Sequence, residues 1–268
     1  MSHYQRIACL STEAVETLYA LGAQDVIAGI SGFTVRPARA REEKTRISGF
    51  SSSNLERILA VEPDLVIGFC DMQADICRDL VMAGIEVHQF NQRTVDGILR
   101  MIAVLAALVR REDAGRELIA SLRTDIAAAR TRAAAWTRKP VMYFEEWNDP
   151  LMSGIGWAAE LIEIAGGADA FPELSTQPGA KERIIADPLA VVARAPDIII
   201  ASWCGKKFQP AQLAARAGCD AIPAVRNGML FEIKSPDILS PGPAAITEGL
   251  RQISDIIAQW QNWQERQA

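Results

Sequence analysis

The regular pattern of the chain begins with Arg6-Ile-Ala-Cys-Leu-Ser-Thr-Glu-Ala-Val-Glu-Thr-Leu-Tyr-Ala-Leu-Gly22 and continues with Val26-Ile-Ala-Gly-Ile30. The run 6–10, which is apolar from Ile7 onward, predicts a buried strand, Ser11 and Thr12 are typical of a helix start, and Gly22 is typical of a helix end. The apolar run 26–30 predicts a second strand. We therefore predict a βαβ unit with two parallel strands.

This alternation of strand and helix continues along both halves of the chain. Pro63-Asp-Leu-Val-Ile67 and Pro196-Asp-Ile-Ile-Ile200 repeat one supersecondary unit. The predicted helices cover 53–60, 73–83, 157–165 and 187–194, with a final helix from Pro243, and the further strands cover 63–69, 86–90, 140–144, 196–203 and 229–233. Such alternation predicts an α/β fold of two Rossmann-like lobes with parallel sheets.

The segment 112–138 separates these two halves and reads as one long helix. Acidic residues crowd its start, Arg130, Arg132, Arg138 and Lys139 crowd its end, and Pro140 closes it. A helix of about 25 residues is roughly 38 Å long. We predict an N-terminal α/β lobe at 1–111, a bridging helix at 112–139 and a C-terminal α/β lobe at 140–268. The alternative is a long helix packed within a single domain.

The composition excludes several classes of protein. The chain has 268 residues, 49% hydrophobic and 23% charged, which is enough for a substantial buried core. The formal net charge is −5 and no basic tract is present, so nucleic acid is not an expected partner. No apolar run approaches the roughly 18 residues that a membrane helix needs, so the protein is not expected to be embedded in a membrane.

The start of the chain and its cysteines bear on the expected compartment. Met1 stands shortly before the first strand with no signal peptide, which predicts a cytoplasmic protein; the alternative is a periplasmic protein whose leader has been removed. The five cysteines form no framework spacing, which suits a reducing compartment where thiols pack as small apolar groups.

The segment 143–167 carries the strongest functional signal. Tyr143-Phe-Glu-Glu-Trp-Asn-Asp-Pro-Leu-Met-Ser-Gly154 is followed by an amphipathic stretch that ends at Gly166-Gly167. We predict a strand over 141–144, a loop, and then a helix. Loops that follow the strands of a parallel sheet are where such folds bind ligands. This loop offers aromatic surface and acceptors rather than a nucleophile with its base, which favours the binding of a large flat molecule.

The order and spacing of several motifs resemble the helical-backbone (class III) substrate-binding proteins, which bind cobalamin, iron-siderophores and haem. The motifs are Ile7 to Gly22, Asn54-Leu-Glu-Arg-Ile-Leu-Ala-Val-Glu-Pro-Asp-Leu-Val-Ile67, Ser153-Gly through Gly167, Ala193-Arg-Ala-Pro-Asp-Ile-Ile-Ile200 and Ser240-Pro. Each is weak alone, but together they cover almost the whole chain. The segment 145–151 resembles a cobalamin-binding branch that often lacks an export signal. The resemblance implies a corrinoid as ligand, bound in the cleft between two lobes, and no catalytic cofactor.

A corrin is a broad apolar disc with amides at its rim, so its site should combine flat apolar side chains with a few polar groups. Phe50 resembles in position a tryptophan that contacts the corrin in exported cobalamin-binding proteins. The candidate contacts are Phe33, Phe50, Trp147, Leu151, Trp157 and Trp203, with Asp71, Gln73, Glu146, Asn148 and Asp149 for the amides. A single tryptophan or phenylalanine is more often part of a core, which is the competing interpretation for each ring.

The resemblance also implies a possible partner. Exported members dock on the permease of an ABC transporter through one acidic residue on each lobe, and Glu56 matches the first position. The second position is Leu189, which weakens docking unless Asp187 or Glu182 replaces it. This favours intracellular handling of a corrinoid over import.

Metal and catalytic sites are not expected. His3 and His88 are the only histidines and lie far from any Cys cluster, so no ligand set for a metal is predicted. Glu145 and Glu146 are adjacent and should point to opposite sides of an extended segment, which argues against a carboxylate dyad. The segment 29–32 lacks the spacing of a phosphate-binding loop.

Three hypotheses remain. The first is non-catalytic binding of cobalamin or a related corrinoid, for uptake or intracellular handling. The second is a receptor that delivers another metal chelate, a ferric siderophore or haem, to an ABC transporter. The third is an enzyme or chaperone that acts on corrinoids. A siderophore site should cluster arginines against an anionic chelate, and Arg36, Arg39 and Arg41 are the only such group in the sequence.

Overall fold

The computed structural model describes residues 3–49 and 54–267, which divide into two compact units. Unit 1 holds the described residues of Met1–Gln92, Asp96–Leu122 and Pro241–Pro243. Unit 2 holds those of Arg93–Val95, Arg123–Ser240 and Ala244–Ala268. The limits 1–111, 112–139 and 140–268 stay a prediction about domains.

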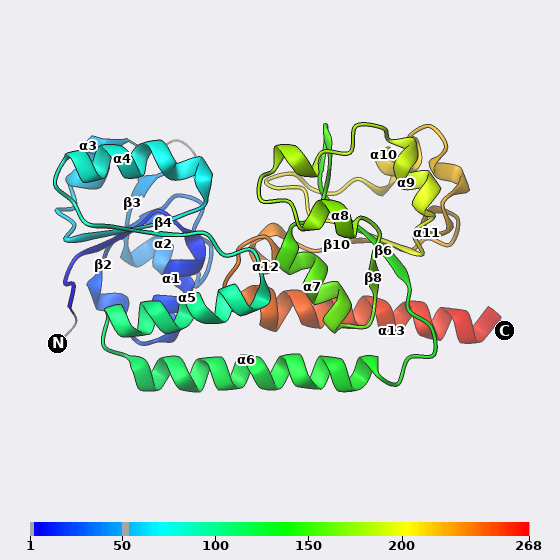
Figure 1. The fold of residues 1–268 in the computed structure, drawn as a ribbon, viewed down its shortest axis with the longest axis horizontal. Helices are drawn as coiled ribbons and strands as arrows, with labels where there is room; N and C mark the ends of the chain where they lie inside the picture. The colour runs from blue at the N-terminus through cyan, green and yellow to red at the C-terminus, as the bar shows by residue number, and fades with distance from the viewer. Residues whose placement is uncertain (1–2, 50–53, 268) are drawn as a thin grey trace. The chain divides into compact units, whose positions relative to one another are not determined.

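Unit 1 is built on a parallel five-stranded sheet in the order β3-β2-β1-β4-β5 (Figure 1). Its central strand is fully buried, with Ile7, Ala8 and Cys9 at 0% exposure, which explains why this run is apolar throughout rather than alternating. The strands are β1 Ile7–Cys9, β2 Ile27–Ser31, β3 Thr45–Ser48, β4 Leu65–Phe69 and β5 Val87–Phe90. All five carboxyl ends therefore lie along one edge.

Helices cover both faces of this sheet. Ile58 of α3 and Leu80 of α4 are fully buried against Ala8, Ile47 and Val66 of the strands, and Figure 1 shows α1 on the other face. The helices are α1 Thr12–Ala20, α2 Ala40–Glu43, α3 Leu55–Leu59, α4 Ala74–Met82 and α5 Val95–Leu108, with 3-10 turns η1 Gln24–Val26 and η2 Asp71–Gln73.

The predicted ends of these helices are largely confirmed. Gly22 follows α1 with a φ of 64°, a backbone conformation that favours glycine. The side chain of Asn54 accepts a hydrogen bond from the Arg57 amide at 3.1 Å and so caps α3. Ser11 occupies the N-cap of α1 but makes no side-chain capping bond.

Helix α1 begins beside a buried carboxyl group. Glu13 is 3% exposed, and the Thr12 hydroxyl donates a hydrogen bond to its Oε2 at 3.3 Å. Burial is the main cause that raises the pKa of Glu13 to about 7. Gly242, from the third segment of unit 1, packs directly on this residue: a Cβ at Gly242 would come within 2.7 Å of the Glu13 Cβ, so only glycine fits there.

Unit 2 is built on a second, mostly parallel sheet in the order β10-β9-β6-β7, with β8 also paired to β6. Only the β6–β7 pair is antiparallel among the described strands of this sheet. The strands are β6 Val141–Asn148, β7 Leu151–Ser153, β8 Ala168–Asp169, β9 Ile198–Ala201 and β10 Leu230–Glu232. Strand β9 is fully buried, as its unbroken Ile-Ile-Ile-Ala sequence predicts.

Helix α7 packs between this sheet and the last helix, α13, and contacts β6 and β8. Its Trp157 is 2% exposed and donates from Nε1 to the carbonyl of Ile238 at 2.7 Å. The helices are α7 Gly156–Ile164, α8 Pro172–Ser175, α9 Leu189–Arg194, α10 Pro210–Ala214, α11 Pro223–Arg226, α12 Ser235–Ile238 and α13 Leu250–Gln267, with short helical turns η3 Lys181–Arg183, η4 Cys219–Ala221 and η5 Ala245–Gly249.

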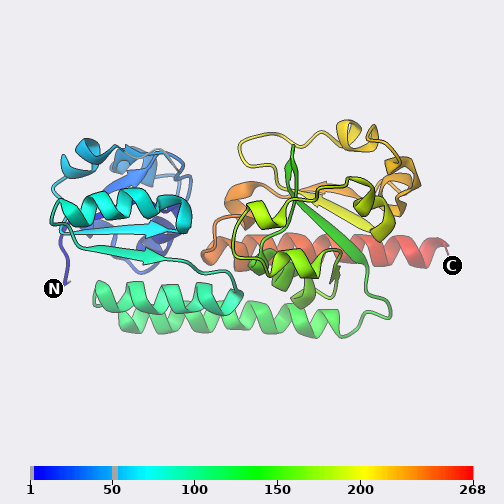
Figure 2. The same cartoon turned by 45° about the horizontal axis from the view of Figure 1, so that its top comes forward.

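The structure confirms the α/β class and corrects some predicted elements. Helix α6 runs over Glu112–Ala133, so it ends before the predicted Arg138. The strand predicted over 141–144 continues to Asn148 and turns back as β7, so the predicted loop is largely a β-hairpin (Figure 2). The sequence did not indicate that β6 continues beyond residue 144, because two glutamates interrupt the apolar run. In the structure each of these glutamates pairs with an arginine.

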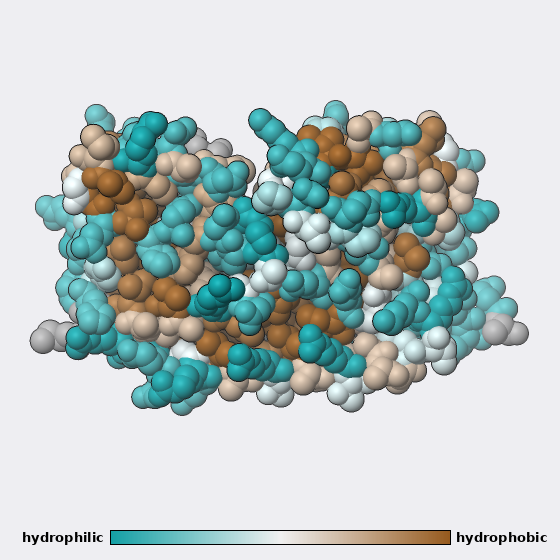
Figure 3. Space-filling model, in the orientation of Figure 1, coloured by the Kyte–Doolittle hydropathy of each residue, from teal (hydrophilic) through white to brown (hydrophobic). Residues whose placement is uncertain are grey.

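The surface mixes polar and apolar side chains. Figure 3 shows teal, hydrophilic residues over much of the viewed face with brown, apolar residues in patches between them. The large apolar side chains most exposed in the described part of the chain are Phe33, Met72, Val81, Met82 and Leu189. No helix within the described residues is long and apolar enough to cross a lipid bilayer.

Candidate ligand-binding site

The β6–β7 hairpin positions the two adjacent glutamates on opposite sides, as predicted. Glu145 is 0% exposed and forms a bidentate ion pair with Arg216: Nη1 to Oε2 is 2.5 Å and Nη2 to Oε1 is 2.9 Å. Trp203 also donates from Nε1 to Glu145 Oε1 at 2.9 Å. Burial lowers the pKa of Arg216, but the hydrogen bond and charge of Glu145 outweigh it and raise that pKa above its usual value. Both oxygens of the Glu145 carboxylate therefore accept hydrogen bonds from Arg216 or Trp203, and these bonds stabilise the site.

Glu146 has a second, separate arginine partner. Arg183, only 2% exposed, donates from Nη1 to Glu146 Oε2 at 2.6 Å and from Nη2 to Oε1 at 3.0 Å. The same guanidinium donates to the carbonyl of Ser153 on β7 at 2.6 Å. Two fork-like pairs therefore fix the hairpin from both sides, a geometry that arginine forms and lysine does not.

The tip of the hairpin presents an aromatic ring. Trp147 is half-buried and donates from Nε1 to the carbonyl of Asp149 at 2.7 Å. Lys206 lies over this ring, with Nζ 4.2 Å from the ring centroid. Asp149 is exposed, Leu151 is 8% exposed at the start of β7, and the Asp149–Pro150 peptide is cis. Of the predicted contacts in unit 2, Glu146, Trp147, Asn148, Asp149 and Leu151 are thus brought together on one hairpin.

The other two tryptophans predicted as ligand contacts are buried inside unit 2. Trp157 lies on the first turn of α7, where its ring nitrogen bonds Ile238. Trp203 is 3% exposed, held by Glu145 and packed edge-on against Phe208 with ring centroids 5.2 Å apart. In this conformation both rings pack in the protein interior, and their contact with a ligand stays a prediction.

In unit 1, the predicted contacts follow the carboxyl ends of β2 and β4. Phe33 is 59% exposed, and Asp71 is exposed at the start of η2. Gln73 is 1% exposed; it accepts from the Phe69 amide at 2.8 Å and donates to the Leu10 carbonyl at 3.3 Å, so it joins the ends of β4 and β1. Phe50 lies outside the described residues.

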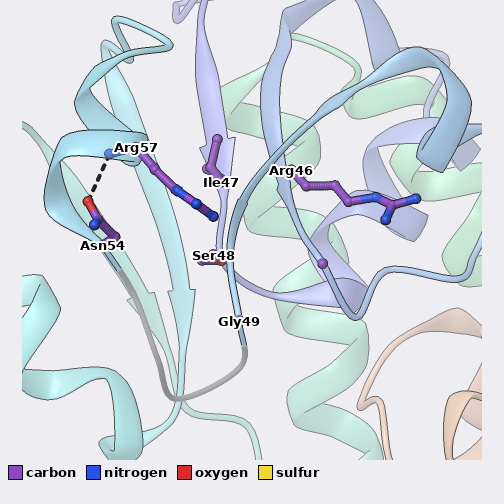
Figure 4. Close-up of a pocket in the computed structure, with 7 residues that line it drawn as sticks. Arg46, Ile47, Ser48, Gly49, Asn54 and Arg57 are labelled. Carbon is purple, nitrogen blue, oxygen red and sulfur yellow. Dashed lines mark hydrogen bonds between the residues drawn. The ribbon is translucent and has the colours of Figure 1, made fainter.

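A hollow of about 460 Å³ opens at the end of β3 in unit 1 (Figure 4). Gly32, Ile47, Ser48 and Asn54 line it, together with Arg46 and Arg57. In Figure 4 the Arg57 side chain extends from α3 toward Ile47 and Ser48, whereas Arg46 points away from them, so the two guanidinium groups do not converge. Arg46 and Arg57, the cationic residues among the described lining of the hollow, therefore do not form a paired site for an anion.

Cys204 lies near Glu146, one of the acidic residues of the site. No group of three or more His, Cys, Asp and Glu residues that could hold a metal ion occurs in residues 3–49 and 54–267. The Cys204 thiol is exposed at the end of β9, and its pKa is raised by partial burial and by the nearby negative charge of Glu146. A thiol with a raised pKa is mostly protonated near neutral pH, which makes it a weak nucleophile.

The sequence interpretation missed the cationic residues of this site. Arg183, Lys206 and Arg216 come from irregular segments with no periodic pattern. One signal was present: Lys206 follows the predicted contact Trp203 by three residues at the carboxyl end of a predicted strand. A residue at that place is as well positioned to meet a ligand as the tryptophan itself.

Comparison with known proteins agrees with this architecture. The model of a family described as periplasmic binding protein matches residues 7–236. The chain belongs to this periplasmic binding protein family. The family is a group of solute-binding proteins, and the resemblance to class III members inferred from the motifs is confirmed.

Individual relatives carry more specific names. A vitamin B12-binding protein of Vibrio campbellii is 27% identical over 202 residues, which are 74% of this chain and 70% of that protein. A cobalamin-binding protein of Halobacterium salinarum is 24% identical over 256 residues, which are 91% of this chain and 67% of that protein.

Solved structures of other proteins share the fold of this chain. The periplasmic vitamin B12 binding protein of Vibrio cholerae superposes with a TM-score of 0.78 at 21% identity, over 96% of this chain and 98% of that one. A periplasmic heme-binding protein of Roseiflexus sp. RS-1 gives a TM-score of 0.78 at 22% identity, over 94% and 98%. At such identities the likeness establishes the fold, and the ligand has to be argued from the site.

Proposed function

We propose that this protein binds cobalamin or a related corrinoid and does not transform it. The observation that carries the proposal is the similarity to a cobalamin-binding protein over 91% of the chain. Relatives from both Vibrio and Halobacterium bear names with the same ligand, although their overall identity to this chain is low.

The chemistry of the exposed candidate residues supports this ligand. Trp147 and Phe33 offer ring faces at the carboxyl ends of β6 and β2, and a corrin presents a broad apolar disc to such faces. Asp71 and Asp149 are exposed acceptors for the amide N–H groups at the corrin rim. We assign direct contact to these residues with Glu146 and Leu151, and a supporting role to Gln73, Trp157 and Trp203.

The state of the site's acids supports binding without catalysis. Glu145 and Glu146 are each engaged by an arginine in two hydrogen bonds, so neither is placed to act as a free general base. A corrinoid incubated with the protein should be recovered chemically unchanged by chromatography. Loss of its upper ligand or side-chain amides would instead support an enzyme or chaperone.

A titration tests the ligand directly. Purified protein is mixed with cyanocobalamin, haem or a ferric siderophore, desalted, and examined for retained absorbance; isothermal titration then gives each affinity. We expect saturable binding of the corrinoid at one site per chain. Saturable binding of haem or a ferric chelate with no binding of corrinoids would overturn the proposal in favour of the second hypothesis, for which the fold likeness to a heme-binding protein is the motivating observation.

The partner and the compartment belong to the same proposal. Glu56 is exposed on α3, but Leu189 is 54% exposed at the corresponding place on α9, so an acidic docking pair for a permease is incomplete. The Vibrio cholerae neighbour is named periplasmic, whereas five cysteines without a disulfide among the described residues suit a reducing cytoplasm. Fractionation of cells that express the natural gene, followed by immunoblotting, decides between these compartments.

A further inference from the structure

The ammonium group of Lys206 lies over the ring of Trp147, where the carboxyl ends of the parallel strands of unit 2 meet. The ammonium lies 4.2 Å from the centroid of the Trp147 ring, within the range of a cation–π interaction. The two residues come from the ends of β6 and β9, which are neighbouring parallel strands. A ligand that reaches the Trp147 ring therefore meets a positive charge at the same place.

The backbone of Lys206 is held by a tight turn. Its amide donates to the carbonyl of Trp203 at 3.0 Å, and Gly205 has a φ of 74°, a conformation that favours glycine. Trp203 is itself held by the buried Glu145 and packs on Phe208. The lysine side chain is exposed, but the point from which it extends is fixed by buried contacts.

Lys206 lies over an aromatic ring rather than beside a carboxylate. The nearby Glu146 is already paired with Arg183, and no carboxylate in the described part of the chain forms an ion pair with Lys206. Burial raises the pKa of the Glu232 carboxyl group, but the hydrogen bond from Lys234 at 2.7 Å and the one from the Phe208 amide outweigh it and lower that pKa, and the charge of the neighbouring Lys207 adds a smaller contribution in the same direction. Lys206 is thus a positive charge available to a ligand, whereas Lys207 faces a carboxylate.

We propose that Lys206 makes the site selective for corrinoids that carry an anionic substituent, the phosphodiester of a complete nucleotide loop. This inference rests on the proposed corrinoid-binding function. A phosphodiester oxygen accepts a charge-assisted hydrogen bond from an ammonium group, which is stronger than a neutral hydrogen bond. A corrinoid that lacks the loop and keeps a net positive charge on its Co(III) centre has no such partner and is repelled by the same ammonium.

The test compares two corrinoids and two lysines. Cyanocobalamin carries the phosphodiester, and aquacyanocobinamide lacks it and is cationic. Their dissociation constants are measured by isothermal titration for the natural protein, Lys206→Met and Lys207→Met. Methionine keeps the length of the side chain and removes the charge, and Lys207→Met removes an equal charge one residue away. Both side chains are exposed, so neither change should lower the unfolding temperature.

We expect the natural protein to prefer cyanocobalamin, and Lys206→Met to weaken cyanocobalamin binding by roughly three- to tenfold while cobinamide binding is unchanged or stronger. Lys207→Met should leave the ratio of the two affinities as it is. Raising the ionic strength from about 50 mM to about 500 mM should reduce the preference of the natural protein toward that of Lys206→Met, because salt screens an exposed charge pair.

The outcomes separate this inference from the proposed function. If both corrinoids bind and Lys206→Met changes their affinities equally, or no more than Lys207→Met does, the selectivity inference is wrong and corrinoid binding stands. If neither corrinoid binds the natural protein, both proposals fail together.

Discussion

The buried carboxyl group of Glu13 should make the stability of the protein depend on pH. Its pKa is raised from an ordinary 4.5 to about 7, mainly because burial disfavours the charged form. Between these two values the folded chain binds a proton that the unfolded chain has released. The contribution of Glu13 to the free energy of unfolding should therefore be fully present below pH 4.5 and be lost as the pH rises through about 7, with no further loss from this group above that.

The size of the effect follows from the same values. Between pH 4.5 and about 7, each pH unit changes the free energy of unfolding by 1.36 kcal/mol, which gives about 3 kcal/mol in total. In Glu13→Gln the side chain stays neutral at every pH, so this loss is absent. The difference in unfolding free energy between Glu13→Gln and the natural protein should grow by roughly 2–3 kcal/mol from pH 5 to pH 8 in favour of the variant.

Urea denaturation at pH 5, 6, 7 and 8, followed by circular dichroism, measures this difference. His88, whose pKa is lowered by burial, destabilises the protein as the pH falls, but it is present in both proteins and cancels in the comparison. Glu56→Gln, a change at an exposed site of the same unit, is the control and should give a difference that does not vary with pH. A constant difference for Glu13→Gln over this range would refute the reasoning.

Three further predictions concern unit 2. Trp147→Ala should weaken corrinoid binding about tenfold with little change in unfolding temperature. Trp157→Ala should instead lower the free energy of unfolding by about 3–5 kcal/mol. An equal loss of stability in both variants would show that Trp147 is also part of the core. Glu145→Ala should cost about 3–5 kcal/mol in urea denaturation, because it leaves a guanidinium unpaired, and a cost below about 1 kcal/mol would contradict the buried ion pair. In thiol titration of the native protein the exposed Cys204 should react, although slowly because its pKa is raised, whereas the buried Cys9, whose pKa burial raises to about 12, should react only after denaturation. Labelling of Cys9 in the native protein, seen in a peptide map, would disprove this.

Local patterns in the sequence were sufficient for most of the fold. The run 6–10, the cap at Asn54 and the glycine at position 22 each act through neighbouring residues, so the β1, α3 and α1 boundaries could be predicted. Strand β3 was missed because its Thr45-Arg-Ile-Ser48 sequence carries one buried apolar residue, as expected at the edge of a sheet.

The candidate site depended on contacts between distant residues and was harder to predict. Nothing near Glu146 in the sequence indicates Arg183, and nothing near Glu145 indicates Arg216, 71 residues later. Without those partners the segment after Phe144 looked too charged to continue as a strand. The aromatic composition of the segment was visible, but which tryptophan would be half-buried and which fully buried depended on the packing of α7 and β9.

The close approach of Gly242 to Glu13 has a consequence for how this protein can be divided. Unit 1 is made from three stretches of chain, and the last of them is only Pro241–Pro243. A fragment that stops at Leu122 would lack those residues, so it would lose the packing of Gly242 on Cα and Cβ of Glu13 and the carbonyl of Pro241 that accepts from Gln92 at 3.0 Å. Expressing the first 122 residues alone would thus leave unit 1 without one of its three segments, so its stability should be measured in the intact polypeptide.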